Sequence, residues 1–330
     1  MKQPLLTIAA FCALSLPVLA QDGTLLRHPA VHPTGSTVAF SYQGDIWTVP
    51  TSGGKATRLT IHEAYESNPV FSPDGKQIAF SGSRYGNNDL FVMDANGGTV
   101  KRLTFHSGAD NISSWTQKDQ IVFSTNREFR QIERPAEVHA ISPNGGTEKR
   151  ILDAVGHDPV ISPNGRFIAF VRGDINPVAR EDYRGSSNRE LWIYDTQKKT
   201  YHTLPAFTTN DILPQWVGDS QLYFLSSEEG VYNLYKFTLD GNGKATKAPE
   251  QITKLKDEAI RAYSLTADGK MAVLEKDTRL YTLDIASGKM QAISVEISAD
   301  DRLDPFETKT FTNGGSDFSV SPNGKLMLFA

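Results

Sequence analysis

The chain has 330 residues and carries 34 basic against 38 acidic side chains, which gives a formal net charge of −4. This charge balance excludes the basic surface that nucleic-acid binding needs. The 26 glycines and 17 prolines are spread through turns, and the sequence has no low-complexity tract. A single cysteine cannot form a disulfide framework, so the fold must be stabilised by packing of its core.

Residues 1–20 have the pattern of a secretory signal peptide. An apolar run over residues 5–16 follows one basic residue, and residues 18–20 end in the small residue that signal peptidase accepts. A transmembrane helix needs about 20 apolar residues, and here the run is shorter and Pro17 interrupts it. The sequence therefore predicts an exported protein, periplasmic or secreted, whose only cysteine, Cys12, is removed with the signal.

The stretch 68–104 predicts one unit of four strands and three turns. Ser72-Pro73-Asp74-Gly75 is a hairpin turn, in which proline sets φ and glycine closes the turn without steric cost. Residues 77–81 alternate as a strand requires, whereas residues 90–93 are apolar on both faces, which is typical of a strand between two sheets. A polar strand over residues 101–104 suits an outer edge.

The same unit recurs along the whole chain. The second strand appears seven times, at residues 37–40, 77–80, 120–123, 167–170, 221–224, 270–273 and 325–329. The third strand appears six times, at residues 45–49, 89–93, 137–141, 190–194, 233–237 and 279–283. From Phe40 to Phe224 the copies are 40 to 54 residues apart, which is the spacing of four-stranded propeller blades and too long for helical repeats of the ankyrin kind.

The predicted fold is all-β, a six-bladed β-propeller of four-stranded antiparallel blades over residues 21–294. Residues 295–315 are expected to be an acidic linker, and residues 316–330 the first hairpin of a truncated second propeller, one of seven blades by the family resemblance given below. The alternative is one seven-bladed ring completed by residues near Leu25 and Leu26. Each of the six blades is contiguous in sequence, so we expect packing between the first and last blades to close the ring, with no sheet shared across the junction.

No constellation of catalytic residues is evident. The seven histidines are scattered and form no two-histidine metal motif, and no Gly-x-Ser-x-Gly elbow is present. Asp240-Gly241-Asn242-Gly243 resembles a calcium loop, but Gln251 stands where a bidentate glutamate is needed, so a hairpin turn is the better interpretation. We predict no catalytic residue, no metal site and no cofactor.

Two long connections between second and third strands carry arginines on one rim of the propeller. They are residues 124–135, with Arg127, Arg130 and Arg134, and residues 171–188, with Arg172, Arg180 and Arg184. Arginines on long loops of a rigid scaffold could bind a peptide carboxylate through bidentate hydrogen bonds. They could equally pair with carboxylates in the same loops, namely Glu128, Glu133, Glu181 and Asp182.

The phrase NPVFSPDGKQIAFSGSRYGNNDLFVMDANGGTVKRLT resembles the repeats of TolB-like proteins, dipeptidyl peptidase propellers and tricorn proteases. The layout of signal peptide, six-bladed ring, acidic linker and a further hairpin is similar to the N-terminal part of a tricorn-like serine peptidase. In that family a six-bladed and a seven-bladed propeller precede a PDZ-like module and the catalytic domains. The likeness covers nearly all of the chain after the signal peptide.

The resemblance implies the non-catalytic propeller region of an exported serine peptidase, which gates or channels peptides. The family's catalytic residues lie in C-terminal domains that are absent from this sequence, so this chain by itself is not expected to hydrolyse peptides. Its implied partners are peptides and the downstream propeller, PDZ-like and peptidase domains, with homo-oligomerisation of the full-length protein. The candidates for anchoring a peptide's C-terminal carboxylate are Arg127, Arg130 and Arg134, although the family pattern is an adjacent arginine pair.

Two other functions remain open from the sequence. A periplasmic TolB-like scaffold would bind a protein partner, but it would have a domain before the propeller, whereas the repeats here begin close to the predicted cleavage site. A prolyl-peptidase-type propeller would be followed by an α/β-hydrolase domain, and the hairpin at Ser321-Pro322-Asn323-Gly324 argues against it.

Overall fold

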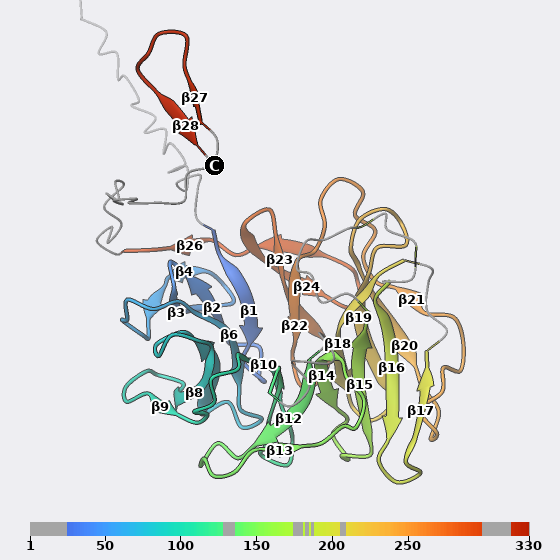
Figure 1. The fold of residues 1–330 in the computed structure, drawn as a ribbon. Coiled ribbons are helices and arrows are strands. Elements are labelled where there is room, and N and C mark those ends of the chain that lie inside the picture. The colour runs from blue at the N-terminus through green and yellow to red at the C-terminus, as the bar shows by residue number, and fades with distance from the viewer. Residues whose placement is uncertain are drawn as a thin grey trace, which may run out of the picture. The chain divides into compact units, whose positions relative to one another are not determined.

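The computed structural model describes residues 25–127, 136–173, 188–204, 209–298 and 318–329, together with Glu181 and Gly185. All of the elements in these ranges are strands, and the chain divides into two compact units at Ile297/Ser298. The first unit consists of six four-stranded antiparallel sheets around a common axis (Figure 1). The prediction of a six-bladed propeller is confirmed.

Each blade contains four strands in chain order, from the central channel outward. Blades one and two consist of β1 (Arg27–Val31), β2 (Thr37–Tyr42), β3 (Asp45–Pro50) and β5 (Thr57–Arg58), and of β6 (Glu66–Phe71), β7 (Gln77–Gly82), β8 (Asp89–Asp94) and β9 (Lys101–Arg102). Blades three and four consist of β10 (Asp110–Trp115), β11 (Ile121–Thr125), β12 (Glu137–Ile141) and β13 (Lys149–Arg150), and of β14 (His157–Ile161), β15 (Phe167–Arg172), β16 (Glu190–Asp195) and β17 (Thr200–Thr203). Blades five and six consist of β18 (Asp211–Val217), β19 (Gln221–Ser226), β20 (Asn233–Thr238) and β21 (Glu250–Gln251), and of β22 (Ala262–Leu265), β23 (Met271–Lys276), β24 (Arg279–Asp284) and β25 (Met290–Ala292).

The hydrophobic core lies between neighbouring blades. The phenylalanine that ends the second-strand repeat in blades one to five is fully buried, as in Phe40 and Phe80. Phe80 packs in one cluster with Ile46 from the preceding blade. All four residues of the third strand Leu90–Met93 are buried, as their uniformly apolar pattern predicts. Burial of apolar surface between blades is therefore what holds the sheets radially.

The inner strands are bulged where a residue precedes proline. His28, Asn68, Asp158 and Leu213 each have φ between 50° and 53°, in the left-handed region, and proline follows each of them. The antiparallel register shifts at the same places in β1, β6, β14 and β18. A β-bulge turns its side chain away from the regular alternation, and here it places these side chains on the wall of the channel.

Side-chain hydrogen bonds tie inner strands of adjacent blades to one another. The backbone N–H of Val31 donates to Ser264 Oγ (3.0 Å), and that of Leu265 donates to Gln215 Oε1 (3.0 Å). Trp216 Nε1 donates to the carbonyl of Val160 (3.3 Å), and Ser114 Oγ to that of Pro159 (3.1 Å). Because these bonds cross between blades, they fix the channel wall as one body.

The ring closes in a way that the repeats did not predict. After blade six the chain returns to blade one, where β26 (Val295–Glu296) pairs in parallel with β4 (Gly54–Lys55). The amides of Gly54 and Ala56 donate to the carbonyls of Ser294 and Glu296, both at 2.8 Å. The expectation of closure by packing alone was therefore wrong, although each blade is contiguous as predicted. This pairing, β4 with β26, is here called the strap.

The second unit, Ser298–Ala330, contains the expected hairpin. In it β27 (Phe318–Val320) pairs antiparallel with β28 (Met327–Phe329), and Val320, Leu326 and Met327 are exposed. The predicted signal peptide and most of the predicted linker lie outside the described residues.

A buried aspartate in blade four should make stability depend on pH. Hydrogen bonds from the Arg166 guanidinium, then from the Lys198 and Gln197 amides, outweigh the effect of burial and lower the pKa of Asp195 from 3.8 to about 2. A depressed carboxyl pKa contributes stability above the unfolded pKa, which is lost as pH falls through the folded pKa. Asp195→Asn should therefore lose about 1–2 kcal/mol at pH 7, after allowance for solvent screening, and almost nothing near pH 2. Urea unfolding at pH 7, 4 and 2.5 checks this, with exposed Asp257→Asn as control, and a loss independent of pH would contradict it.

Candidate functional site

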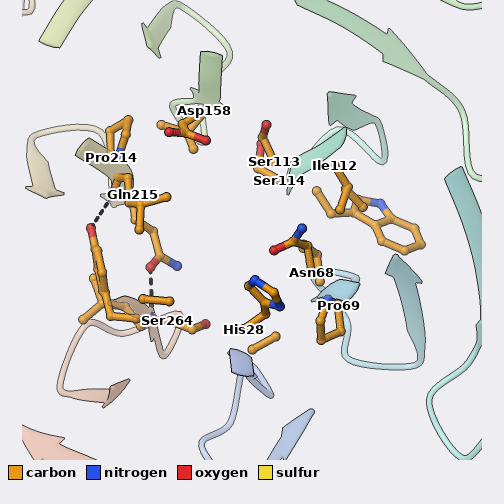
Figure 2. A pocket seen from close by; sticks show the side chains of 18 of the residues that line it. His28, Asn68, Pro69, Ile112, Ser113, Ser114, Asp158, Pro214, Gln215 and Ser264 are labelled. Carbon is orange, nitrogen blue, oxygen red and sulfur yellow. Dashed lines mark hydrogen bonds between the residues drawn. The ribbon is translucent and has the colours of Figure 1, made fainter. Parts of the chain in front are cut away.

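The central cavity of the propeller is the candidate site. It has a volume of about 720 Å³, within the range of ligand-binding cavities, and residues of all six inner strands line it (Figure 2). The two ends of the channel differ in character. Charged residues lie at or just before the starts of inner strands, as Arg27 and Arg261 do. Prolines and tryptophans such as Pro33 and Trp216 lie near or just beyond the ends of these strands.

One polar side chain from each blade lies around the centre of this channel. Figure 2 shows these side chains around an open centre, and we call the set the polar ring: His28, Asn68, Ser113, Asp158, Gln215 and Ser264. All six are half-buried. Three of them occupy the bulges described above, so the distorted inner strands help to build the ring. This ring was not predicted from the sequence. A signal for it was present, because the inner-strand segments of several repeats contain a residue followed by proline, as at His28, Asn68 and Asp158.

The polar ring carries a fixed negative charge but no fixed positive one. Burial, followed by the charge of Arg27, lowers the pKa of His28 to about 4, so its imidazole is neutral at pH 7. Burial alone would raise the pKa of Asp158, but His157 and Arg189 outweigh it and hold that pKa below its usual value. Asp158 is therefore ionised at neutral pH, while the other members of the ring are uncharged hydrogen-bonding groups.

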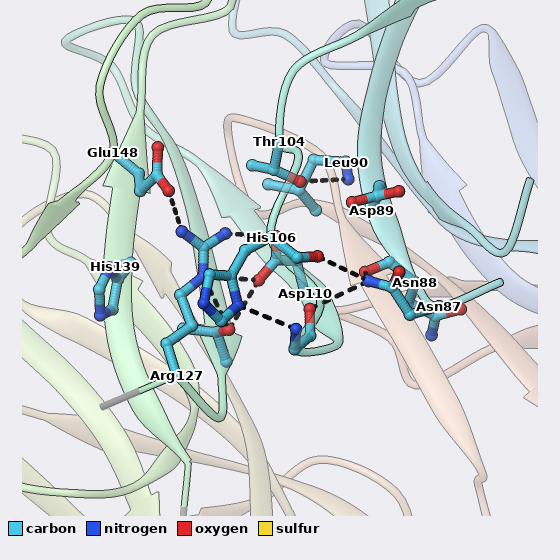
Figure 3. Close-up of polar contacts among 12 residues, drawn as sticks. Asn87, Asn88, Asp89, Leu90, Thr104, His106, Asp110, Arg127, His139 and Glu148 are labelled. Carbon is cyan, nitrogen blue, oxygen red and sulfur yellow. Dashed lines mark hydrogen bonds and ion pairs between the residues drawn. The ribbon is translucent and has the colours of Figure 1, made fainter. Parts of the chain in front are cut away.

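Of the three arginines predicted to bind substrate, Arg127 lies in a buried ion-pair network. Its Nε and Nη2 donate to the two carboxylate oxygens of Asp110 (3.2 and 2.5 Å), and its Nη1 donates to Glu148 (Figure 3). The side chain is 6% exposed. Burial alone would lower the pKa of Arg127, but both carboxylates outweigh it and raise the pKa above its ordinary value. Arg130 and Arg134 lie outside the described residues.

The partners of Arg127 differ from the loop carboxylates considered from the sequence. In blade two, Arg84 follows the second strand by two residues and pairs with Glu66 at the start of the inner strand. Arg127 has the same position relative to Asp110 in blade three. Alignment of these two repeats was therefore a signal for a structural ion pair at Arg127.

Metal and membrane features are not found in the part of the chain that the structure describes. Among these residues no three or more His, Cys, Asp or Glu side chains are grouped as a metal ion would need. In the same ranges there is no helix of the length and apolarity required to span a bilayer.

Comparisons with known proteins give one family model and relatives of two kinds. Residues 23–289 match the model of the tricorn protease N-terminal beta propeller domain. The chain is 28% identical over 271 residues to tricorn protease homolog 1 of Streptomyces coelicolor, which covers 80% of this chain and 24% of that protein. It is 30% identical over 235 residues to the Tol-Pal system protein TolB of Francisella tularensis, which covers 68% of this chain and 51% of that protein.

The fold comparison agrees with the sequence matches. The crystal structure of the tricorn protease superimposes with a TM-score of 0.69 at 19% identity, covering 93% of this chain and 29% of that one. The chain thus spans about a quarter of the length of the curated tricorn relatives that it matches, 24% in two of them.

Proposed function

Because the chain belongs to the family of tricorn protease N-terminal β-propeller domains, we propose that it is the non-catalytic, substrate-handling propeller of an exported tricorn-like serine peptidase. In this role the channel gates or conducts peptides. The observation that carries the proposal is the cavity of about 720 Å³, which has walls from all six blades. Hydrogen bonds between the inner strands of adjacent blades hold this wall together, as those from Val31 to Ser264 and from Leu265 to Gln215 do.

The remainder of the full-length protein is part of the same proposal. Residues 298–330 would lead into a second propeller, with PDZ-like and peptidase domains beyond it, and the whole would assemble as a homo-oligomer. Residues 1–20 would direct export. The gene downstream of Ala330 tests this directly, because a stop codon soon after it would remove the peptidase.

The proposed anchor for a peptide's C-terminal carboxylate narrows to Arg130 and Arg134. Arg127 shares the loop with them, but its guanidinium is already bonded to Asp110 and Glu148. Peptides with free and amidated C-termini separate the possibilities, since equal affinity for the two would remove the carboxylate role.

A second candidate function is that of a TolB-like scaffold, and the 30% identity to TolB over 235 residues favours it. A scaffold would bind a folded protein on its surface and would not need an open channel. Blocking the channel therefore distinguishes the two functions.

Ser113→Trp is the blocking variant that the structure indicates. Ser113 lines the cavity, is half-buried and makes no side-chain hydrogen bond among the described residues, so a large side chain there fills the channel without removing a contact. We expect fluorescence anisotropy to show at least about tenfold weaker peptide binding, as expected from loss of about 1.4 kcal/mol. Glu63→Trp, on an exposed connection outside the cavity, is the control. Equal peptide binding by Ser113→Trp and the unmodified chain would contradict a channel function.

A further inference from the structure

The cavity has a second set of equivalent residues, at the end where the inner strands finish. In every blade a turn follows the inner strand, and the first residue of that turn lines the cavity. We call these six residues the collar: Pro33, Pro73, Gln117, Pro163, Gly218 and Ala267. None of them is charged, and four are proline or alanine.

Charged groups are kept away from the collar. The next residue of each turn is polar and exposed and does not line the cavity: Thr34, Asp74, Lys118, Asn164, Asp219 and Asp268. The charged residues that do line the cavity lie toward the other end, where the inner strands begin: Arg27, Asp158, Arg189, Arg261 and Glu275. The wall of the channel is therefore charged at one end and uncharged at the other.

The aromatic residues beside the collar have their polar atoms already bonded. Trp115 Nε1 donates to Asp119 Oδ1 (2.9 Å), and Trp216 Nε1 donates to the carbonyl of Val160 (3.3 Å). The prolines of the collar have no N–H group to donate. This end of the channel thus offers mainly hydrocarbon surface to whatever enters it.

The collar is held together from blade six through blade one to blade two. The amide of Ala267 donates to the carbonyl of Pro33 (3.2 Å), which joins the turns of blades six and one. The His32 ring packs against Gly75, in the turn of blade two that carries Pro73. Ala267, Pro33 and Pro73 therefore lie on neighbouring turns that are fixed against one another.

We propose that this end of the channel binds a large apolar side chain of a peptide, with Ala267, Pro33 and Pro73 as the surface that it contacts. Removing apolar surface from water is favourable, whereas a charged or amide side chain would lose its hydration and meet no charged partner in the collar. The inference rests on the proposed function, because it assumes that peptides enter the channel. It adds the class of side chain that the channel prefers.

Isothermal titration calorimetry of the 330-residue chain with two peptides tests this preference. The peptides share a sequence of glycine and serine and differ only at one central residue, which is leucine in one and asparagine, of similar size, in the other. The leucine peptide should bind about tenfold more tightly, because burial of a leucine side chain is worth at least that factor.

Opposite substitutions at one collar position make the test specific. The side chain of Ala267 is a single methyl group on an exposed turn residue, so a larger side chain there removes no other contact. Ala267→Glu should abolish the preference for leucine by placing a charge in the collar, whereas Ala267→Leu, which adds similar bulk, should enlarge it several-fold. Ala286→Glu, on an exposed turn of the same blade outside the cavity, is the matched control and should change nothing.

The results distinguish failure of this inference from failure of the proposed function. Equal affinity of the unmodified chain for the two peptides would overturn the apolar site and leave the peptide channel standing, whereas absence of binding by either peptide would overturn both. Weaker binding of both peptides by Ala267→Leu would mean obstruction by bulk and would overturn the assignment to the collar. A leucine preference that Ala267→Glu leaves intact would overturn it as well.

Discussion

Replacing Arg127 by alanine should lower the free energy of unfolding by about 3–5 kcal/mol, because it leaves a buried carboxylate without its partner. Asp110 is fully buried and receives two hydrogen bonds from the guanidinium, in the geometry that makes arginine–carboxylate pairs strong (Figure 3). Thr125 Oγ1, at 2.6 Å, is the other donor to this carboxylate in the described part of the chain. It is a neutral group and cannot balance the charge.

Urea unfolding followed by tryptophan fluorescence measures this effect, since Trp115 lies in the same blade. The control is Lys76→Ala, which removes an exposed ion pair with Asp74 and should change stability by less than about 1 kcal/mol. If Arg127→Ala left stability unchanged but weakened binding of peptides with free C-termini, the side chain would act on substrate and not on the fold.

Phe80→Ala should also cost about 3–5 kcal/mol, because it opens a cavity where two blades meet. Phe80 is fully buried, stacks on Phe91 at 5.6 Å between ring centroids, and packs against Ile46 of blade one. The loss is therefore not confined to one sheet but weakens the contact between blades one and two.

Phe105→Ala provides the matched control within the same part of the ring. Phe105 follows the last strand of blade two and is 71% exposed, so its removal takes little apolar surface from the core. We expect a change of less than about 0.5 kcal/mol. Similar losses for the two variants in chemical denaturation would mean that the repeated phenylalanine does not form the interface between blades.

The fold could be predicted because the same pattern of strands and turns recurs in every blade. One blade is ambiguous, but six copies of the second strand, 40 to 54 residues apart, predict a radial array of blades. The phenylalanines that recur in these strands are buried between the blades. The strap could not be predicted in the same way. Val295 and Glu296, which pair with Gly54 and Lys55, lie outside the repeat. A strand of two residues is too short to show the alternation of apolar and polar residues from which strands are predicted.

The candidate site was less predictable for a physical reason. Arginines on long loops are conspicuous in a sequence, but whether a guanidinium is free depends on carboxylates brought to it by the fold, as Asp110 is to Arg127. The residues of the polar ring, by contrast, are not conspicuous in the sequence. His28, Asn68 and Asp158 are common turn residues, and only the bulge before proline directs them to the axis.

The strap also bears on where this domain can be cut. Gly53 lies so close to Ser294 that a Cβ atom on residue 53 would be 2.8 Å from the carbonyl oxygen of Ser294. The segment that returns from blade six therefore packs tightly against blade one. A fragment that ended at residue 294, the boundary predicted from the repeats, would lack β26 and therefore its pairing with β4. Expression boundaries and domain transplants should therefore extend to Ile297, which packs with Val295 on the core shared by the first and last blades.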